Sequence, residues 1–393
     1  MTDQTNTPEL RFPEFKKEWQ CNTLDNCCYK ISDGIHSTPI YSKSGDFSFI
    51  NGNNLINGKI HFENAKLVDS KEALKHKRNL TYNETILLSI NGTIGNIALY
   101  RGEKIILGKS AAYINIKANF LNPLFLYYFL ETNSLQRYFR SELTGTTIKN
   151  LSIKSIKKTK LYIPNITEQR KIGDFFSKLD QQIELEEKKL ELLEQQKKGY
   201  IQKIFSQELR FKDGSGNEYP EWEEKTIKDV YKVTRGYVLA RKLMSDNPNS
   251  INKYPVYSSQ TSNNGLMGYY SDYLYQDAIT WTTDGANAGS VSFRQGKFYC
   301  TNVCGVLLNE LGNSNVCMAE MLNNIAFKYV SKVGNPKLMN NVMAMIKLKF
   351  PCLEEQQAIS KFLNVFSEVI DNQNKKVELL KERKKGFLQK MFV

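Results

Sequence analysis

The chain has 393 residues, of which 41% are hydrophobic, 11% aromatic and 24% charged, a balance that excludes a wholly disordered or fibrous protein and predicts two or three domains. It carries 54 Lys and Arg against 41 Asp and Glu, and the resulting net charge of +13 favours a polyanionic partner. No apolar run is long enough to cross a membrane, no secretion signal opens the chain, and the seven cysteines are an odd number, so we expect a cytoplasmic protein with free thiols.

The first globular half is expected to span residues 1–163. It contains the segment ELRFPEF at residues 9–15, followed by short strands interrupted by glycine. Residues 85–102 form a β-rich run, a glycine-containing turn and a second β-rich run, which predicts a hairpin. Asn122 and Pro123 then predict the start of a helix through the apolar run that follows.

Residues 164–205 predict one long helix. Glu168 suits its first turn, where an acidic side chain stabilises the helix dipole. Apolar residues follow at alternating steps of four and three, a period typical of a coiled-coil seam, and polar residues interrupt it at Glu186 and Lys197. The seam consists of Ile172, Phe176, Leu179, Ile183, Leu190 and Leu193.

The second globular half, residues 206–350, repeats the signals of the first. Residues 208–222 contain ELRF and, after a glycine-rich insertion, a PEW that corresponds to the earlier PEF. Residues 277–296 predict another hairpin, and Asn315 predicts another helix start.

The last segment, residues 351–393, predicts a second long helix. Residues 351–392 align with residues 164–205 without a gap at an offset of 187, and 17 of the 42 positions are identical. An ungapped match of this kind indicates an internal repeat. The corresponding seam consists of Ile359, Leu363, Phe366, Ile370, Val377 and Leu380.

The expected fold is α/β (α+β) with a pseudo-two-fold repeat. Two globular domains are separated by two long helices, which return to form an antiparallel intramolecular coiled coil; two helices that each pack only on their own domain are the alternative. Residues 1–163 carry a net charge of +8 and residues 206–350 carry +3, whereas the two helical segments carry 0 and +2. This division favours globular halves that contact a polyanion and helices that contact protein.

The motifs of common catalytic centres are absent from the sequence. Gly108-Lys109-Ser110 lacks the upstream glycine of a phosphate loop, and no G-x-G-x-x-G, G-x-S-x-G or H-E-x-x-H occurs. There is no Asn-Pro-Pro-aromatic run of an amino-methyltransferase. Cys300 and Cys304 lie in an apolar run that predicts a buried strand, so structural thiols are the better interpretation than metal ligands.

The whole chain resembles the specificity subunit of type I restriction–modification enzymes. The features that carry the resemblance are LRFPEF, the helix starts PNITEQRKI and PCLEEQQAI, the helix ends KKGYIQKIF and KKGFLQKMF, and the loops SINGTIG and YPVYSSQTSNNGLMGYY. The resemblance implies that each globular half is a target-recognition domain for one part of a split DNA site, and that the coiled coil sets the unread spacer.

The resemblance also implies the partners. Two methyltransferase subunits, and in restriction also two motor/nuclease subunits, are expected to assemble with this chain. S-adenosylmethionine, ATP and Mg²⁺ are expected on those partners, while this chain holds no cofactor or metal and has no catalytic residue of its own.

Candidate DNA-binding residues are donors, acceptors or cations on predicted loops, although each is also a common turn or solvated residue. In the first half they are Lys43, Asn91, Thr93, Lys109, Thr146, Thr147 and Lys149. In the second half they are Arg235, Tyr257, Ser259, Gln260, Asn263, Asn264, Asn287, Lys337 and Asn340.

Two other functions remain as alternatives. A coiled-coil scaffold whose halves bind proteins would show no steep loss of DNA affinity with salt. An enzyme without recognisable motifs would turn over substrate in the absence of partners.

Overall fold

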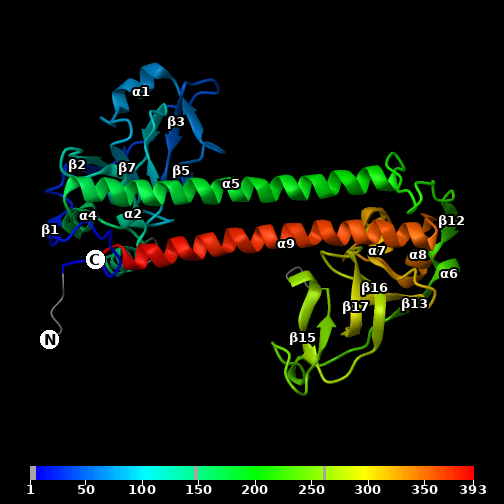
Figure 1. The fold of residues 1–393 in the computed structure, drawn as a ribbon. Coiled ribbons are helices and arrows are strands. Elements are labelled where there is room, and N and C mark those ends of the chain that lie inside the picture. Colours follow the sequence, from blue (N-terminus) through cyan, green and yellow to red (C-terminus); the bar gives the residue numbers. More distant parts are fainter. Residues whose placement is uncertain (1–5, 146–148, 260–262) are drawn as a thin grey trace. The chain divides into compact units, whose positions relative to one another are not determined.

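The computed structural model describes residues 6–145, 149–259 and 263–393. The chain forms two compact units, each described here by itself (Figure 1). Unit 1 consists of Met1–Glu187 and Lys375–Val393, and unit 2 consists of Lys188–Asn374.

Unit 1 is built on two main sheets. The larger has the order β2-β10-β7-β8 and is antiparallel; its strands are Cys28–Asp33, Ala111–Ile116, Thr85–Ser89 and Ile97–Leu99. The smaller has the order β6-β3-β9, with strands Lys66–Val68, Phe47–Ile50 and Ile105–Leu107. Two-stranded ribbons join β1 (Gln20–Thr23) to β11 (Lys160–Ile163) and β4 (Leu55–Ile56) to β5 (Lys59–Ile60). The helices are η1 (Gly52–Asn54), α1 (Ser70–His76), α2 (Pro123–Glu131), α3 (Asn133–Ser141) and α4 (Ile153–Lys158).

The predicted hairpin at residues 85–102 is confirmed by the antiparallel pair β7–β8. The predicted helix after Asn122 is interrupted: α2 ends at Glu131, and Thr132 has an extended backbone and caps α3, its hydroxyl accepting from the Leu135 amide. A threonine that caps a new helix competes with continuation of the old one. The apolar run therefore divides into a helix that is almost wholly buried and a second, amphipathic helix.

Unit 2 is built on one six-stranded sheet with the order β13-β18-β16-β17-β14-β15. The strands are Lys232–Arg235, Cys304–Leu308, Tyr275–Thr282, Val291–Cys300, Tyr254–Tyr257 and Leu266–Tyr270. A separate ribbon pairs β12 (Glu223–Thr226) with β19 (Lys347–Phe350). The helices are α6 (Ile227–Val230), η2 (Arg241–Leu243), η3 (Asn263–Gly265), α7 (Val316–Ala326), η4 (Phe327–Tyr329) and α8 (Asn340–Ala344). The second predicted hairpin is confirmed by the antiparallel pair β16–β17.

The repeated segments form the two long helices α5 (Ile166–Phe205) and α9 (Leu353–Lys390). In unit 1 the beginning of α5 lies against the chain at the end of α9, where the rings of Phe176 and Phe392 stack with centroids 5.9 Å apart. In unit 2 the end of α5 lies against the beginning of α9, where Tyr200 meets Phe362 edge-on at 5.3 Å. Both contacts have the antiparallel sense that the sequence predicts.

The apolar seam of this helix pair is buried most deeply where it also joins a domain core. Ile172 and Phe176 belong to the core of unit 1, and Ile359 and Leu363 to that of unit 2. The remaining seam residues are buried or half-buried: Leu179, Ile183, Leu190, Leu193, Phe366, Ile370, Val377 and Leu380. Each long helix therefore packs both on the other long helix and on a globular core. The two arrangements that the sequence left open, an antiparallel helix pair and packing on a domain, occur together.

Candidate nucleic-acid interface

A buried ion pair fixes the start of α5 to the N-terminal segment of unit 1. Arg11 donates from Nε and Nη2 to the two carboxylate oxygens of Glu168, at 2.6 and 2.8 Å. Trp19 Nε1 donates to the same carboxylate at 3.3 Å. Glu168 is fully buried, and three donors compensate for the loss of its hydration.

The same arrangement recurs in unit 2. Arg210 donates to the two carboxylate oxygens of the buried Glu355 at 2.9 and 3.0 Å, and Trp222 Nε1 donates to it at 2.8 Å. The hydrogen bonds to these carboxylates raise the pKa of both arginines. The sequence predicted a helix-dipole role for Glu168; in the structure Glu168 and Glu355 are also the buried acceptors of these ion pairs.

The PEF and PEW segments were paired wrongly from the sequence. Trp222 takes the place of Trp19, since Arg210 Nη2 donates to the Pro220 carbonyl as Arg11 Nη2 donates to that of Lys17. The spacing from arginine to tryptophan is four residues longer in unit 2 because of the glycine-rich turn. The preceding ELRF was matched correctly.

The glutamine that follows each buried glutamate connects the start of the long helix to the N-cap residue of an earlier helix, α2 in unit 1 and α7 in unit 2. Gln169 Nε2 donates to the Pro164 carbonyl at 2.9 Å, and its Oε1 accepts from the Asn122 amide at 2.8 Å. Gln356 Nε2 donates to the Pro351 carbonyl at 2.9 Å, and its Oε1 accepts from Asn315 Nδ2 at 2.8 Å. Asn122 and Asn315 in turn cap α2 and α7. The Glu-Gln pair is therefore the joint that holds each domain on its helix.

In unit 1, polar loops meet at one end of the larger sheet. Ser110 donates from its hydroxyl to Asn51 Oδ1 at 3.0 Å and accepts from the Gly52 amide at 2.9 Å. Thr93 donates to the Gly52 carbonyl at 3.2 Å. Asn91 forms a backbone bridge with Asn150, which brings the loop before α4 to the same end. We call this group of loops the unit 1 loop cluster.

The structure brings four of the predicted unit 1 residues to this cluster. Thr93, Lys109 and Lys149 are exposed, and Asn91 has a buried Oδ1 with no hydrogen-bond partner among the described residues. Lys43 is exposed on a different loop, next to Ser42, which bridges to β6. Thr146 and Thr147 lie outside the described residues.

Unit 2 has an equivalent cluster, which we call the unit 2 loop cluster. Asp284 forms a backbone bridge and a 3.5 Å ion pair with Lys337, and Asn287 Nδ2 donates to the Ser259 carbonyl at 3.5 Å. The amide of Leu338 donates to the Thr283 carbonyl at 2.9 Å, matching the bond from Leu151 to Ile90 in unit 1. The two clusters therefore occupy equivalent places in the repeat.

The other predicted residues of unit 2 lie around this cluster. Asn263 and Asn264 are exposed and have positive φ angles of 50°, a conformation that asparagine tolerates. Arg235 is exposed at the end of β13, and Asn340 Nδ2 donates to the adjacent Thr234 carbonyl at 3.2 Å. Tyr257 is half-buried. Gln260 lies outside the described residues.

The sequence analysis missed Arg294, which lies on β17 with 8% of its surface exposed. Its Nε donates to Thr280 Oγ1 at 3.1 Å, and its guanidinium lies 3.9 Å from the centre of the Tyr257 ring. Burial lowers the pKa of this arginine. An arginine that directly follows Val-Ser-Phe in a predicted hairpin strand is the signal that could have identified it.

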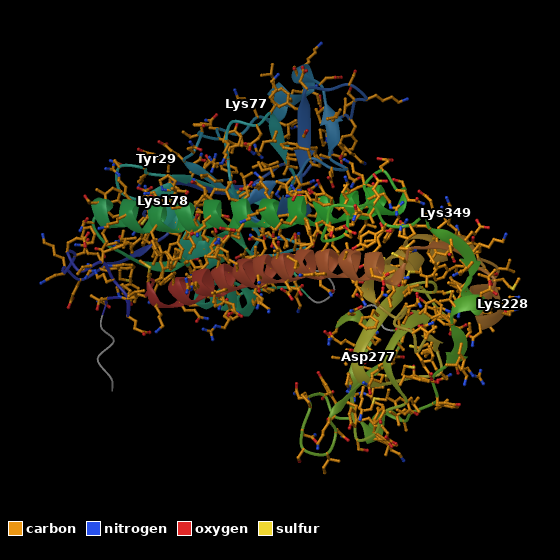
Figure 2. The ribbon with its side chains drawn as sticks, turned by 45° about the vertical axis from the view of Figure 1, so that its right-hand side comes forward. Tyr29, Lys77, Lys178, Lys228, Asp277 and Lys349 are labelled. Carbon is orange, nitrogen blue, oxygen red and sulfur yellow. The ribbon has the colours of Figure 1, made fainter. Side chains whose placement is uncertain are left out.

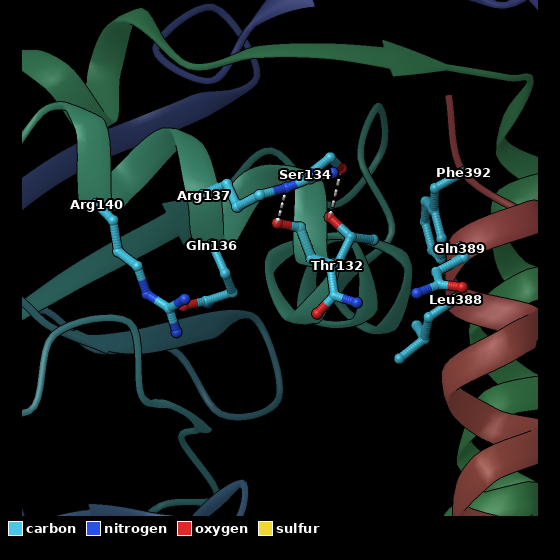
Figure 3. A pocket seen from close by; sticks show the side chains of 9 residues that line it. Thr132, Ser134, Gln136, Arg137, Arg140, Leu388, Gln389 and Phe392 are labelled. Atoms are coloured by element: carbon cyan, nitrogen blue, oxygen red, sulfur yellow. Dashed lines mark hydrogen bonds between the residues drawn. The ribbon is translucent and has the colours of Figure 1, made fainter.

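A hollow lies beside the C-terminal end of each long helix. In unit 1, a hollow of about 480 Å³ separates α3 from the end of α9, with Arg137 and Arg140 on the α3 side and Phe392 opposite (Figure 3). In unit 2, a hollow of about 500 Å³ lies between the end of α5, at Phe205, and η4, at Tyr329. The two hollows are equivalent in the repeat, but the second is lined by more apolar side chains than the first, among them Met321 and Ile325.

The exposed positive charge is spread over the molecule. Lys77 of unit 1 and Lys228 and Lys349 of unit 2 are exposed and project from the surface (Figure 2).

Within the described ranges, no three His, Cys, Asp or Glu side chains are grouped so that they could hold a metal ion. No helix in the described parts of the chain is both long and apolar enough to cross a membrane.

Comparison with known proteins identifies the family. Residues 16–195 and 219–382 match the family described as type I restriction modification DNA specificity domain. Two Mycoplasma pneumoniae proteins named as type I specificity subunits are 40% identical over 145 residues (36% of this chain, 75% of that protein) and 32% identical over 240 residues (57% and 81%). The crystal structure of the S subunit from a type I restriction–modification system of M. genitalium has the same fold, with a TM-score of 0.63 and 18% identity over 98% of this chain and 99% of that one. The chain therefore belongs to the type I restriction–modification specificity-subunit family.

Proposed function

We propose that this chain reads a bipartite DNA site for a type I restriction–modification complex, with each unit contacting one half-site. The observation that carries the proposal is the duplicated framework. In both units an Arg–Glu–Trp group and a Glu-Gln joint fix the domain to the start of its long helix, and a loop cluster lies at one end of a sheet. The framework is repeated, whereas the residues on the loops differ, as two different half-sites require.

The chemistry of the clusters suits this role. Lysines such as Lys109, Lys149 and Lys337 would neutralise phosphates, which supplies affinity that falls with salt. Amide and hydroxyl side chains such as Asn91, Thr93 and Asn287 would hydrogen-bond with base edges, which supplies specificity.

The paired long helices would set the unread spacer. A helix of 40 residues is about 60 Å long, and a helix pair is far stiffer than an unstructured linker. Because the face of DNA rotates with every base pair, two heads must be held at a fixed distance and rotation to read a split site.

The outer faces of the long helices would bind two methyltransferase subunits. Leu192 on α5 and Leu379 on α9 are equivalent in the repeat, and they are 58% and 47% exposed. Two equivalent apolar side chains are what two copies of one partner require. S-adenosylmethionine would be held by those subunits, and ATP and Mg²⁺ by up to two motor/nuclease subunits, while this chain would contribute no catalytic group.

The test is to co-express the chain with its methyltransferase partner and to map N6-methyladenine by single-molecule sequencing. A split motif with a fixed gap, lost when this chain is deleted, is the expected result. Sequence-independent methylation by a stable, purified complex would instead support a protein scaffold and overturn the proposal.

A further inference from the structure

Arg294 lines a polar cavity of about 190 Å³ at the loop end of the unit 2 sheet. The cavity is also lined by hydroxyl and amide side chains: Ser258, Asn264, Thr280, Thr282, Asn287 and Ser292. Gly265 leaves room above the guanidinium, because a Cβ there would lie 3.5 Å from Arg294 Nη2 and 2.8 Å from the Ser258 carbonyl oxygen.

Arg294 carries a buried positive charge that is not neutralised by a carboxylate in the described part of the chain. Among the described residues, no carboxylate forms an ion pair with this guanidinium. The groups that surround it closely are the Tyr257 ring and the thiols of Cys300 and Cys304, and none of these is a carboxylate. Burial raises the pKa of both thiols, which disfavours their negatively charged forms. A buried charge without a partner is costly, and a structure tolerates it where an anion can be bound.

We propose that this cavity binds one phosphate group of the DNA backbone, with Arg294 as its charged donor. The inference rests on the proposed function and names a contact within it. An arginine can donate two parallel hydrogen bonds to a phosphate, and the surrounding hydroxyls and amides can donate to the remaining oxygens.

The recessed position of Arg294 favours phosphate over a base edge. Base edges lie at the floor of a groove, so a side chain that reads them must project from the protein surface. Arg294 does not project, since it is buried on a strand and its guanidinium is held against Tyr257. A phosphate, by contrast, projects from the duplex and can enter a shallow cavity.

The experiment uses the full chain in complex with its methyltransferase partner and a duplex that carries the mapped site. Each phosphate near the half-site is replaced in turn by an uncharged methylphosphonate. One position is expected to weaken binding by roughly ten- to a hundredfold with the native chain, and to have little effect with Arg294→Met. Arg294→Met should also lower the slope of log affinity against log salt by about 0.9 while the methylated motif stays the same.

Two variants and one free anion complete the test. Arg294→Lys keeps the charge and should retain the salt slope. Thr280→Val removes the acceptor of Arg294 Nε and the donor to the Ser292 carbonyl, and it should weaken binding at the same phosphate if Arg294→Met does not fold. Inorganic phosphate, compared with chloride at equal ionic strength, serves as the DNA-free probe. If it stabilises the native chain but no methylphosphonate couples to Arg294, the cavity binds a free anion and the DNA contact is overturned.

The outcomes separate this inference from the proposed function. A complex that binds no split site contradicts the proposed function itself. A complex that binds its site, but whose affinity, salt slope and methylphosphonate pattern are unchanged by Arg294→Met, contradicts only the phosphate pocket. Relaxed specificity at one base pair with an unchanged slope would make Arg294 a base-reading residue instead.

Discussion

In unit 1 the loop cluster is made of hydroxyl and amide groups that bond to one another, with Lys109 and Lys149 exposed beside them. In unit 2 the equivalent place holds a buried cation, Arg294, at the wall of a cavity. Both units nevertheless contain an equivalent Arg–Glu–Trp group, which fixes the domain to its long helix. The repeated residues therefore build the scaffold, whereas the side chains of the loop clusters differ between the units.

The long helices also differ between the units, in the partners of one equivalent lysine. Lys384 in unit 1 lies between Asp180 and Glu131, at 2.8 Å from each. Its repeat equivalent in unit 2, Lys197, faces the Ser367 hydroxyl at 3.0 Å and Glu320 at 3.5 Å. Because Ser367 replaces an aspartate, the polar position of the seam is more strongly paired in unit 1.

The largest expected effect comes from breaking the shared scaffold. Glu168→Ala and Glu355→Ala should each lower the free energy of unfolding by about 3–5 kcal/mol, because each leaves a partly buried arginine and a buried tryptophan N–H without their acceptor. Urea unfolding of the two variants measures this. Glu14→Ala is the control, since its pair with Lys171 is exposed and should contribute little to the free energy of unfolding. A large loss in only one unit would contradict a common scaffold.

Adjacent leucines on α9 should separate folding from partner binding. Leu380 is 8% exposed, so Leu380→Lys buries a charge and should destabilise the chain by several kcal/mol, about 3 or more. Leu379→Lys should leave the thermal midpoint unchanged and weaken association with the methyltransferase subunit. Thermal unfolding and co-purification test the pair of variants. Normal assembly of Leu379→Lys, and of Leu192→Lys on the other helix, would show that partners bind elsewhere.

Replacing Lys384 or Lys197 should change the free energy of unfolding by smaller and unequal amounts. Lys384→Met leaves Asp180 and Glu131 close together without their cation, and should cost about 1–3 kcal/mol in the free energy of unfolding. Lys197→Met loses weaker contacts and should cost about 0–1 kcal/mol. Urea unfolding of both variants measures the difference, and equal losses would contradict the contrast between the units.

The smallest expected effect is a difference in thiol reactivity between a buried and an exposed cysteine. Burial raises the pKa of Cys304, beside the Arg294 cavity, to about 11, so its thiol stays protonated at pH 8 and should react slowly with iodoacetamide. The exposed Cys21 of unit 1 should react first. Mass spectrometry of the native chain over time reads out both. Rapid labelling of Cys304 in the folded chain would contradict its buried position.

Local patterns predicted most of the fold. The long helices follow from the period of their apolar residues, and the hairpins from glycine turns between β-rich runs, since both signals are contained in neighbouring residues. The break at Thr132 was missed because residues that favour a helix continue on both sides of it, in the apolar α2 and the amphipathic α3. The strand order of the six-stranded sheet could not be predicted, since it depends on contacts between distant segments.

The candidate site was predictable only in part, for the same reason. Arg11 and Glu168 are 157 residues apart, so no local pattern connects them. Arg294 was missed because a strand residue was not considered as a ligand. Asn91, Thr93, Lys109 and Lys149 were chosen as loop residues, and the structure brings them to one cluster because their loops all follow strands or helices that end there.

Two matched triple variants test most directly whether each unit reads its own half-site. The methylation motif of each variant is mapped by single-molecule sequencing. One variant carries Asn91→Ala, Thr93→Ala and Lys109→Ala in unit 1; the other carries Ser259→Ala, Asn287→Ala and Lys337→Ala in unit 2. Each variant is expected to change or weaken a different half of the split motif, while the gap and the other half stay the same. Loss of the same half in both variants, or a change in the gap, would contradict the account that each unit reads its own half-site.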